Sequence, residues 1–405
     1  MAGTKSKKPI GLLTNFQVIS PRQQFQQGEA LDWLARVHAR AEAVVRGNGD
    51  LELATAQKIR KLISRFGCDE TRIGTRGVEN GDTGRTDFER MDVYRIAAPT
   101  GDSGPYLEGA IGSGMLKRTQ VFAHAVLGVM ERMYPLGPVP SEGPAHIIHV
   151  TCTGYSSPSA AQAIVDLRGW QGHTDVTHAY HMGCYASLPA VRMAEGFVAV
   201  NQQAVDIVHT EMCSLHLNPL DYSPEQLVVN SLFADGFIKY TVAPADEAGR
   251  AGLEVQAVHE FLIPGTRDCM TWVAADWGMK MSLSRDVPHH VSGNIEGFLD
   301  ALLSRAGFDT VEERAALRRS AIFAIHPGGP RIIDATQKLL ELSEEQIAHS
   351  KEILFKHGNM SSATLPHIWN AVLSDPEIAA GRHLISLAFG PGLTIFGAVL
   401  RKRSP

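Results

Sequence analysis

From Leu116 to the C-terminus, strand-like runs alternate with helix-like segments, and this alternation limits the fold more than any other feature of the sequence. Short apolar runs such as His146–Cys152 and Ser320–Ile325 are separated by segments with helical periodicity, among them Lys117–Tyr134 and Asn294–Ala306. Strands that alternate with helices form sheets that the helices cover. The pattern therefore predicts an α/β layered fold.

Other elements are expected along the chain. Strands are predicted at Pro9–Val18, Val176–Tyr180, Val205–Glu211, Leu384–Phe389 and Leu393–Leu400, and helices at Ala30–Phe66, Ser159–Arg168, Ala190–Val200, Ile332–Leu340, Glu345–Phe355 and Ser361–Val372. Lys239–Val242 and Leu253–Ile263 are predicted to be antiparallel strands, and Asn230–Asp235 to begin a helical turn. The Gly-, Asp-, Arg- and Thr-rich stretch Gly74–Ser113 is typical of a long loop or insertion, and its role stays open.

The composition is that of a globular protein. With 405 residues the chain can bury a substantial core, and we expect two halves. The formal net charge of −5 leaves no basic surplus for nucleic acid. No apolar run approaches the ~18 residues of a membrane span, and no secretory signal follows the basic N-terminus. Five widely spaced cysteines without a CxxC pair fit a reducing compartment. We therefore expect a cytoplasmic protein that binds neither nucleic acid nor membrane.

One cysteine stands in a distinctive local setting. Cys184 follows Gly183 and comes just before the helix-like segment Ala190–Val200. A thiol at the positive end of a helix dipole has a lowered pKa, so Cys184 is predicted to be a nucleophile. Two polar residues lie in similarly tight settings downstream: His326 in a His-Pro-Gly-Gly-Pro run, and Asn359 in a Gly-Asn-Met-Ser-Ser run.

Together these three residues indicate covalent acyl chemistry. An imidazolium at His326 would favour the Cys184 thiolate, and His326 and Asn359 can both donate hydrogen bonds to one carbonyl oxygen or enolate. Carbon–carbon bond formation would then need neither a metal nor an organic cofactor. Each residue also has a simpler interpretation, namely a packed thiol, a helix cap and a left-handed turn, respectively. Spacing alone does not decide between the two.

The histidine pairs of the chain do not predict a metal site. In a strand, residues three apart point to opposite faces, so His146 and His149 would chelate a metal poorly. The sequence has no His-Glu-x-x-His motif, and no carboxylate stands at helical spacing from a histidine pair. We therefore expect no metal.

Longer motifs surround the three residues. Gly183-Cys184-Tyr185-Ala186, His326-Pro327-Gly328-Gly329-Pro330 and Gly358-Asn359-Met360-Ser361-Ser362-Ala363 resemble the Cys, His and Asn motifs of type III polyketide synthases, the chalcone synthase-like branch of the thiolase-fold condensing enzymes. Further similar runs follow the family's order: Thr153-Gly154 with Pro158, Leu232-Phe233-Ala234-Asp235-Gly236, Arg285-Asp286-Val287-Pro288 and Phe389-Gly390-Pro391-Gly392-Leu393-Thr394. The resemblance covers the chain from Thr151 to the C-terminus.

The resemblance implies a five-layered αβαβα thiolase fold built from two related halves, and a homodimer. Residues 1–243 would form the half with the nucleophilic cysteine, and residues 244–405 the half with the histidine and asparagine. Cys184 would accept an acyl group from coenzyme A. His326 and Asn359 would then drive decarboxylation of malonyl-CoA and condensation. The family uses acyl-CoA and malonyl-CoA as substrates and needs no cofactor.

The same resemblance assigns the substrate cavity. Phe233 matches the family's gatekeeper phenylalanine, between the coenzyme A tunnel and the cavity. The other cavity-lining positions, by alignment, are Cys152, Cys213, His216, Trp272 and Met281. A tryptophan where a small residue is common should fill volume, so we expect the plant flavonoid cavity to be absent. Ala234 and Ser157 also depart from the plant pattern, and together these changes indicate a bacterial-type enzyme with its own starter preference.

A basic cluster precedes this region, and its commonest interpretation is a solvated helix face. In the family, basic residues in the corresponding region contact coenzyme A phosphates. The members of the cluster here are Lys58, Arg60, Lys61, Arg65, Arg72 and Arg76.

The leading interpretation is a type III polyketide synthase that loads an acyl-CoA starter, extends it with malonyl-CoA and releases a pyrone or a resorcinol- or phenol-type ring by cyclisation. A single-condensation ketosynthase, joining an acyl group to a β-ketoacyl chain, is the alternative among enzymes, and a carrier protein is then a possible donor. A catalytically silent thiolase-fold partner subunit is the alternative of another class. The starter, the number of extensions and the mode of ring closure depend on cavity shape, which the sequence does not reveal.

Overall fold

The computed structural model describes residues 11–97, 111–137, 142–246 and 249–404, and its centre is a mixed sheet of nine strands. The strands lie in the order β11-β12-β13-β8-β1-β7-β6-β4-β5. Their bounds are β1 Gly11–Ile19, β4 His146–Thr151, β5 Asp175–Tyr180, β6 Val205–Met212, β7 Asp235–Pro244, β8 Gly252–Leu262, β11 Ile322–Ile325, β12 His383–Gly390 and β13 Thr394–Arg403. β1 pairs along β7 but contacts β8 only through Leu12 and Leu13. The sheet is therefore two half-sheets joined along one short seam.

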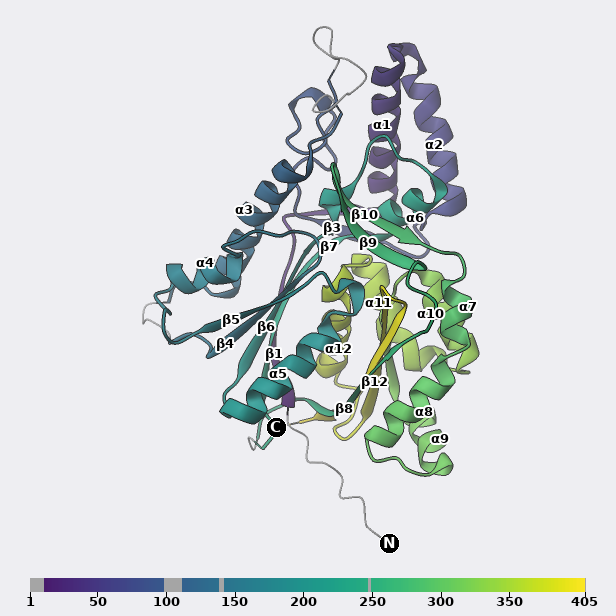
Figure 1. The fold of residues 1–405 in the computed structure, drawn as a ribbon. Helices are drawn as coiled ribbons and strands as arrows, with labels where there is room; N and C mark the ends of the chain where they lie inside the picture. The colour runs from purple at the N-terminus through teal and green to yellow at the C-terminus, as the bar shows by residue number, and fades with distance from the viewer. Residues whose placement is uncertain (1–10, 98–110, 138–141, 247–248, 405) are drawn as a thin grey trace.

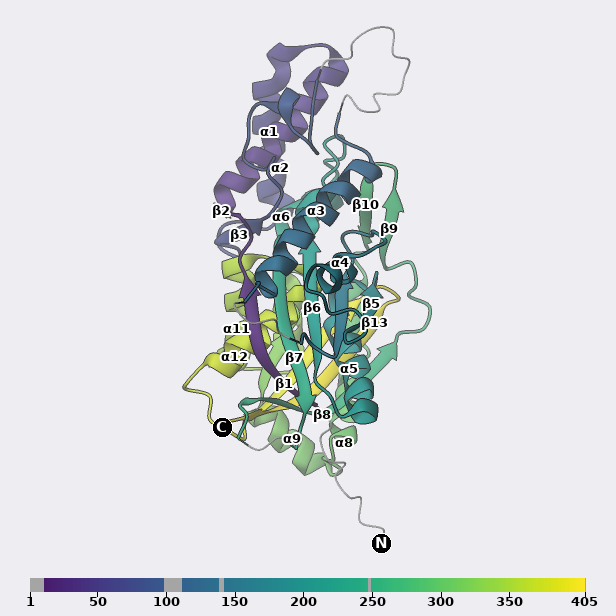
Figure 2. The same cartoon turned by 90° about the vertical axis from the view of Figure 1, so that its left-hand side faces the viewer.

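Helices lie between the half-sheets and outside them (Figures 1 and 2). The two in the middle are α5 (Ser187–Asn201) and α12 (Thr364–Ser374). The half-sheet of β4 to β7 is covered by α3 Met115–Met133 and α4 Ala160–Leu167. The helices α1 Gln27–Arg46 and α2 Glu52–Phe66 share the same hydrophobic core but extend beyond the edge of the sheet (Figure 1). The half-sheet of β8 and β11 to β13 is covered by α7 Val287–Ser292, α8 Ile295–Arg305, α9 Val311–Ser320, α10 Pro330–Leu339 and α11 Glu344–His357.

Three hydrophobic cores separate these layers. The first joins side chains of α5 and α12, such as Val191 and Trp369, to strands of both half-sheets. The second joins α1 to α4 to one half-sheet, and the third joins α7 to α11 to the other. The central core fills the space on both sides of the middle helices, and each of the other two lies between a half-sheet and its outer helices. The layers therefore follow the order helix, sheet, helix, sheet, helix. The predicted five-layered αβαβα fold is confirmed.

The strand directions bring distant loops to one edge. β4 runs parallel to β5 and β6, and β11 runs parallel to β12. Parallel strands need crossover connections, and α4 and α5 supply them for β4, β5 and β6. The loops after parallel strands leave from the same edge of each half-sheet, so residues that follow β4, β5 and β6 lie near one another.

Two of the predictions about local structure are wrong: one pairing of strands and the start of one helix. The strands predicted at Lys239–Val242 and Leu253–Ile263, here β7 and β8, do not pair, because β1 lies between them and runs antiparallel to both. Asn230–Asp235 does not begin a helix: it contains the end of α6 (Pro224–Leu232) and the start of β7. The helix begins earlier because the Ser223 side chain caps it and Pro224 occupies its first turn.

A hairpin that the sequence did not indicate forms beside α6. Its strands are β9 (Met270–Ala275) and β10 (Gly278–Leu283), which pair antiparallel and place Trp272 opposite Met281. The stretch Gly74–Ser113 contains β3 (Thr75–Val78), which pairs with β2 (Gln23–Gln26). Part of that stretch, residues 98–110, lies outside the described residues, and its role stays open.

The predicted division at residue 243 stays a prediction. β7 ends at Pro244 and β8 begins at Gly252, but the two half-sheets share β1 and one central core. Within the described part of the chain, no helix combines the length and the apolar character that a membrane crossing requires.

Candidate active site

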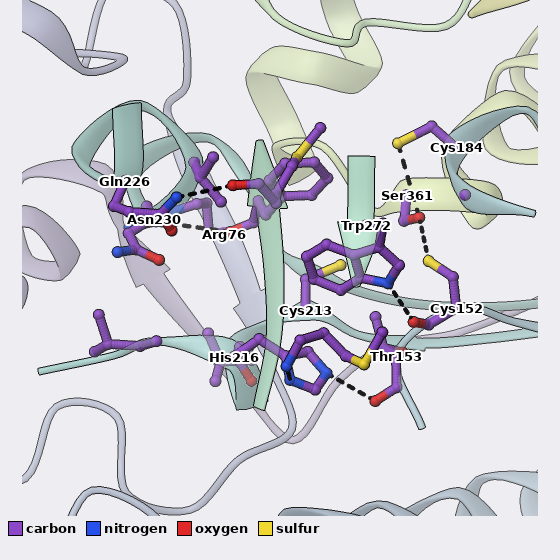
Figure 3. A pocket seen from close by; sticks show the side chains of 18 of the residues that line it. Arg76, Cys152, Thr153, Cys184, Cys213, His216, Gln226, Asn230, Trp272 and Ser361 are labelled. Carbon is purple, nitrogen blue, oxygen red and sulfur yellow. Dashed lines mark hydrogen bonds between the residues drawn. The ribbon is translucent and has the colours of Figure 1, made fainter. Parts of the chain in front are cut away.

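A cavity lies where β4, β5 and β6 end (Figure 3). Its wall includes Cys184, the predicted nucleophile. It also includes all six residues predicted to contact substrate, which are Cys152, Cys213, His216, Phe233, Trp272 and Met281. The fold thus brings together residues that follow three strands, one residue at the end of a helix and two residues of a hairpin, whereas the roles assigned to them remain predictions.

Gly183 shapes the turn that carries Cys184. Its φ is +77°, a left-handed conformation that glycine adopts without strain, and a Cβ there would come within 2.9 Å of Pro391 Cδ. The turn continues as the 3₁₀ segment Gly183–Tyr185, and α5 begins at Ser187. The Cys184 side chain is thereby held on the cavity wall, and the residue is 9% exposed.

The predicted lowering of the Cys184 pKa is wrong. Burial raises the pKa of this thiol to about 12, although the nearby side chains of Ser361 and Asn359 oppose the shift. Cys184 lies in the turn before α5 rather than within the helix, and the loss of water outweighs the field of the helix end. The resting site therefore holds a neutral thiol.

The predicted imidazolium is also wrong. His326 is fully buried, and burial lowers its pKa to about 3, so the ring is neutral at pH 7. It follows the end of β11, where its backbone N–H donates to Leu387 O at 2.8 Å. Neither ring nitrogen has a hydrogen-bond partner among the described residues. His326 does not cap α10, because no side chain caps that helix.

Asn359 is fixed by its backbone and by one side of its amide. Its N–H donates to Leu232 O at 3.0 Å, and its carbonyl accepts from Ala234 N at 2.9 Å. Oδ1 accepts from the backbone N–H of Ser361 at 2.8 Å, which leaves Nδ2 without a partner among the described residues. The residues with positive φ in this run are Gly358 and Ser361, so Asn359 does not serve the left-handed turn.

The structure thus links two of the three predicted catalytic residues through Ser361. Ser361 lies two residues after Asn359, its N–H donates to Asn359 Oδ1, and its hydroxyl lies 3.8 Å from Cys184 Sγ. His326 reaches the same region along β12, which pairs with β11 and ends at Gly390. A Cβ on Gly390 would overlap the ring of Tyr185, next to Cys184. His326 therefore follows the strand beside the one whose end packs against the cysteine turn.

A buried network behind the cavity was not predicted. The carboxylate of Glu211 accepts from Cys152 N at 3.0 Å, from Thr153 Oγ1 at 2.9 Å and from Ser362 Oγ. Cys152 Sγ in turn lies 3.1 Å from the hydroxyl of Ser361. Burial raises the pKa of Glu211, and the hydrogen bonds it accepts oppose this shift. An acidic residue within the apolar run of β6 was the available signal in the sequence.

The ring nitrogens of two predicted pocket residues, His216 and Trp272, bond to backbone groups. His216 Nε2 lies 2.8 Å from Thr153 O, and its Nδ1 accepts from Met279 N at 3.0 Å, which fixes a neutral tautomer. Burial lowers the pKa of His216 to about 3. Trp272 Nε1 donates to Cys152 O at 2.6 Å. The rings of Trp272 and His216 meet edge to face, with centroids 5.5 Å apart, and the pair fills part of the cavity wall.

The described side chains offer no cluster for a metal. Among residues 11–97, 111–137, 142–246 and 249–404, no three His, Cys, Asp or Glu side chains are grouped as metal ligands would be.

Known proteins are similar to this chain in sequence and in fold. Residues 254–404 match the family model for the C-terminal domain of chalcone and stilbene synthases. The type III polyketide synthase A of Arabidopsis thaliana is 29% identical over 269 residues, which cover 65% of this chain and 67% of that protein. The probable polyketide synthase 1 of Dictyostelium discoideum is 30% identical over 258 residues, 63% of this chain but 8% of that protein.

A solved structure extends the likeness to nearly the whole chain. The C-terminal type III polyketide synthase domain of a type I/III hybrid from Dictyostelium superposes with a TM-score of 0.77 at 23% identity, covering 97% of this chain and 99% of that one. The fold is that of the thiolase-fold condensing enzymes. The chain is similar to the type III polyketide synthases, the chalcone synthase-like family, as its Cys, His and Asn motifs indicated.

Proposed function

We propose that this protein loads an acyl group from coenzyme A onto Cys184 and extends it by decarboxylative condensation with malonyl-CoA. The observation that carries the proposal is the Gly358–Ser362 run, which places the Ser361 hydroxyl 3.8 Å from the Cys184 thiol on the cavity wall and leaves the amide Nδ2 of Asn359 without a partner among the described residues. A covalent acyl carrier and an unused hydrogen-bond donor are the two groups that acyl transfer needs.

The neutral resting states of Cys184 and His326 support the following order for the loading step. The Cys184 proton passes to the neutral imidazole of His326 as sulfur attacks the thioester carbonyl, and Asn359 Nδ2 donates to the oxygen that becomes negative. The carbon–sulfur bond to coenzyme A then breaks, and its thiolate leaves with the proton from His326. A base that is neutral at pH 7 can accept this proton, which an imidazolium could not.

The same donors serve carbon–carbon bond formation. Malonyl-CoA loses carbon dioxide, and the electrons of the broken bond form an enolate whose oxygen accepts hydrogen bonds from Asn359 and His326. The enolate carbon attacks the acyl thioester on Cys184, forms the new bond and releases the Cys184 thiolate. Because the wall around the thiol carries neutral groups, the enolate depends on these two donors.

The remaining features of the proposal follow the family. We propose that the enzyme acts as a homodimer, takes both substrates as coenzyme A thioesters without a cofactor, and releases its product by cyclisation inside the cavity. Trp272 narrows the cavity, which supports a starter and a ring closure that differ from those of plant flavonoid enzymes.

The test is incubation with hexanoyl-CoA and carbon-13-labelled malonyl-CoA, followed by mass spectrometry of the intact protein and the products. We expect a hexanoyl adduct on Cys184 and labelled products with two or more malonyl-derived units. Cys184→Ala should abolish both, whereas Cys68→Ala, which removes a buried thiol away from the cavity wall, should retain them.

The outcomes separate the alternatives. A product with one new carbon–carbon bond, formed only when a carrier protein supplies the second chain, would favour a single-condensation ketosynthase. Absence of any adduct with hexanoyl-, acetyl- or malonyl-CoA would favour a catalytically silent partner subunit and overturn the proposal.

A further inference from the structure

Arg76 carries a positive charge into the cavity. It belongs to β3, is 7% exposed and lies on the cavity wall (Figure 3). Its place is therefore inside the molecule, and its assignment to a solvated basic helix face is wrong. The stem of the side chain packs close to Gly358, the residue before Asn359, where an added Cβ would lie 3.1 Å from Arg76 Cγ.

The guanidinium uses few of its donors. Nη1 donates to Asn230 O at 2.7 Å and to Phe233 O at 3.0 Å, both at the end of α6. Nε is buried and has no partner among the described residues. A guanidinium has five N–H donors, so most of its hydrogen-bonding capacity is unused. A role in capping α6 accounts for Nη1 but leaves the other donors unexplained.

No carboxylate of the described chain forms an ion pair with Arg76. Asp235 is an acid that acts on it electrostatically, but the oxygens of Asp235 accept from Glu79 N at 2.7 Å, Ser214 N at 2.8 Å and Ser214 Oγ at 2.7 Å. The described cavity wall contains no Asp, Glu or Lys, and its histidine is neutral. A buried charge without a partner is costly, whereas a bound anion would offset that cost.

We propose that Arg76 binds a carboxylate at the far end of the acyl chain carried by Cys184. The inference rests on the proposed function and names its starter class: coenzyme A thioesters of dicarboxylic acids. Figure 3 places Arg76 and Cys184 on opposite sides of the cavity, with Trp272 between them. The carboxylate that malonyl-CoA loses must lie beside Asn359 and Cys184, so Arg76 is suited to the distal end of the chain. A planar guanidinium can hold a carboxylate through two parallel hydrogen bonds.

The test compares pairs of thioesters that differ only at the distal end. Loading of Cys184 is timed by intact-protein mass spectrometry without malonyl-CoA, for adipoyl- against hexanoyl-CoA and for suberoyl- against octanoyl-CoA. We expect wild-type protein to load at least one dicarboxylic thioester faster than its partner. Arg76→Gln should slow loading of that dicarboxylic thioester by about tenfold or more, and should leave the loading rate of its fatty acyl partner within about twofold of the wild-type rate. Arg76→Lys keeps the positive charge but lacks the planar guanidinium, and should restore part of the preference for the dicarboxylic thioester.

A second buried arginine provides the control. Arg118 is 1% exposed, also lacks a carboxylate partner among the described residues, and is not on the cavity wall. Arg118→Gln should lower the free energy of unfolding without changing the preference. Equal slowing of both members of a pair by Arg76→Gln would mean that Arg76 serves the coenzyme A moiety or the fold, and would overturn the inference.

Failure of the inference is distinguishable from failure of the proposed function. If hexanoyl-CoA loads Cys184 but no dicarboxylic thioester is preferred by wild-type protein at any length, the carboxylate site is refuted and the condensing activity stands. If no thioester loads Cys184, the proposed function itself fails. Arg76→Gln could instead slow the loss of carbon dioxide from malonyl-CoA and leave loading of Cys184 unchanged. Arg76 would then bind the carboxylate of malonyl-CoA, and this result would also refute the inference.

Discussion

The hydroxyl of Ser361 lies 3.8 Å from the sulfur of Cys184. On its other side the same hydroxyl lies 3.1 Å from Cys152 Sγ, so it bridges the predicted nucleophile to the Glu211 network. Ser361 has a positive φ of 50°, which is held by the hydrogen bond from its N–H to Asn359 Oδ1. The bridge therefore depends on the same short run that positions the amide of Asn359, the predicted hydrogen-bond donor.

Removing this hydroxyl should make Cys184 less reactive. The Ser361 hydrogen bond lowers the pKa of Cys184 against burial, and a bond of about 1 kcal/mol corresponds to about a fivefold change in thiolate population. We expect Ser361→Ala to slow iodoacetamide alkylation of Cys184 about fivefold at any pH between 7 and 9. In wild-type protein the rate should rise through this range without a plateau, because the pKa is about 12. A plateau below pH 8 would contradict the neutral thiol. Ser343→Ala, which removes the cap of α11, is the matched control.

Gly183→Ala should damage the site more than a comparable glycine substitution elsewhere. Alanine at a left-handed position costs about 1–2 kcal/mol, and at Gly183 the new Cβ would also press on Pro391. Gly47 has a similar φ of +61° with no atom within 4 Å of its added Cβ. We expect both variants to lose about 1–2 kcal/mol in urea unfolding, and Gly183→Ala alone to slow hexanoyl loading by about tenfold. Equal loading rates in the two variants would show that the turn does not position the thiol.

Trp272→Ala should widen the cavity. The indole lies on the wall and donates to Cys152 O at 2.6 Å, so the change removes both volume and a hydrogen bond. We expect faster loading of long fatty acyl-CoAs and longer products by liquid chromatography and mass spectrometry. The free energy of unfolding should fall by about 2 kcal/mol, less than for a fully enclosed tryptophan. Trp272→Phe keeps a ring but not the N–H, and should retain the wild-type product lengths. An unchanged product profile in Trp272→Ala would contradict the volume argument.

Stability should fall as the pH drops from 7 to 5. Burial lowers the pKa of six histidines, to about 4 for His38 and His367 and to about 3 for His149, His209, His216 and His326. Below pH 6.5 these histidines bind protons in the unfolded chain but stay neutral in the folded protein. Their contribution to the free energy of unfolding is therefore fully present above this pH and is lost as the pH falls. At pH 5 each histidine costs about 2 kcal/mol.

Four carboxyl groups act in the opposite direction, since burial raises the pKa of Asp235 to about 6, that of Glu195 to about 7, and those of Glu79 and Glu211 as well. The histidines outnumber them, so the net slope should stay positive with pH. Urea unfolding midpoints at pH 7.5, 6 and 5 measure this dependence. A midpoint that is constant or rises toward pH 5 would show that these rings are not buried in the neutral form.

Much of the layered fold follows from local patterns. The 3.6-residue periodicity of Lys117–Tyr134 and the apolar run His146–Cys152 predict α3 and β4, because each helix or strand must turn its own apolar face toward a core. The glycine before Cys184 predicts a tight turn, since only glycine enters the left-handed region freely. The motifs around Cys184, His326 and Asn359 likewise indicate the family.

Tertiary structure alone decided how these parts meet. β1, from the start of the described chain, lies between β7 and β8, a pairing that depends on long-range closure and leaves no mark in the local sequence. Long-range packing also decided the neutral state of the Cys184 thiol, the lack of a carboxylate partner for Arg76 among the described residues, and the Glu211 network. Removal of water depends on all the atoms that surround a group, and those atoms come from segments hundreds of residues apart.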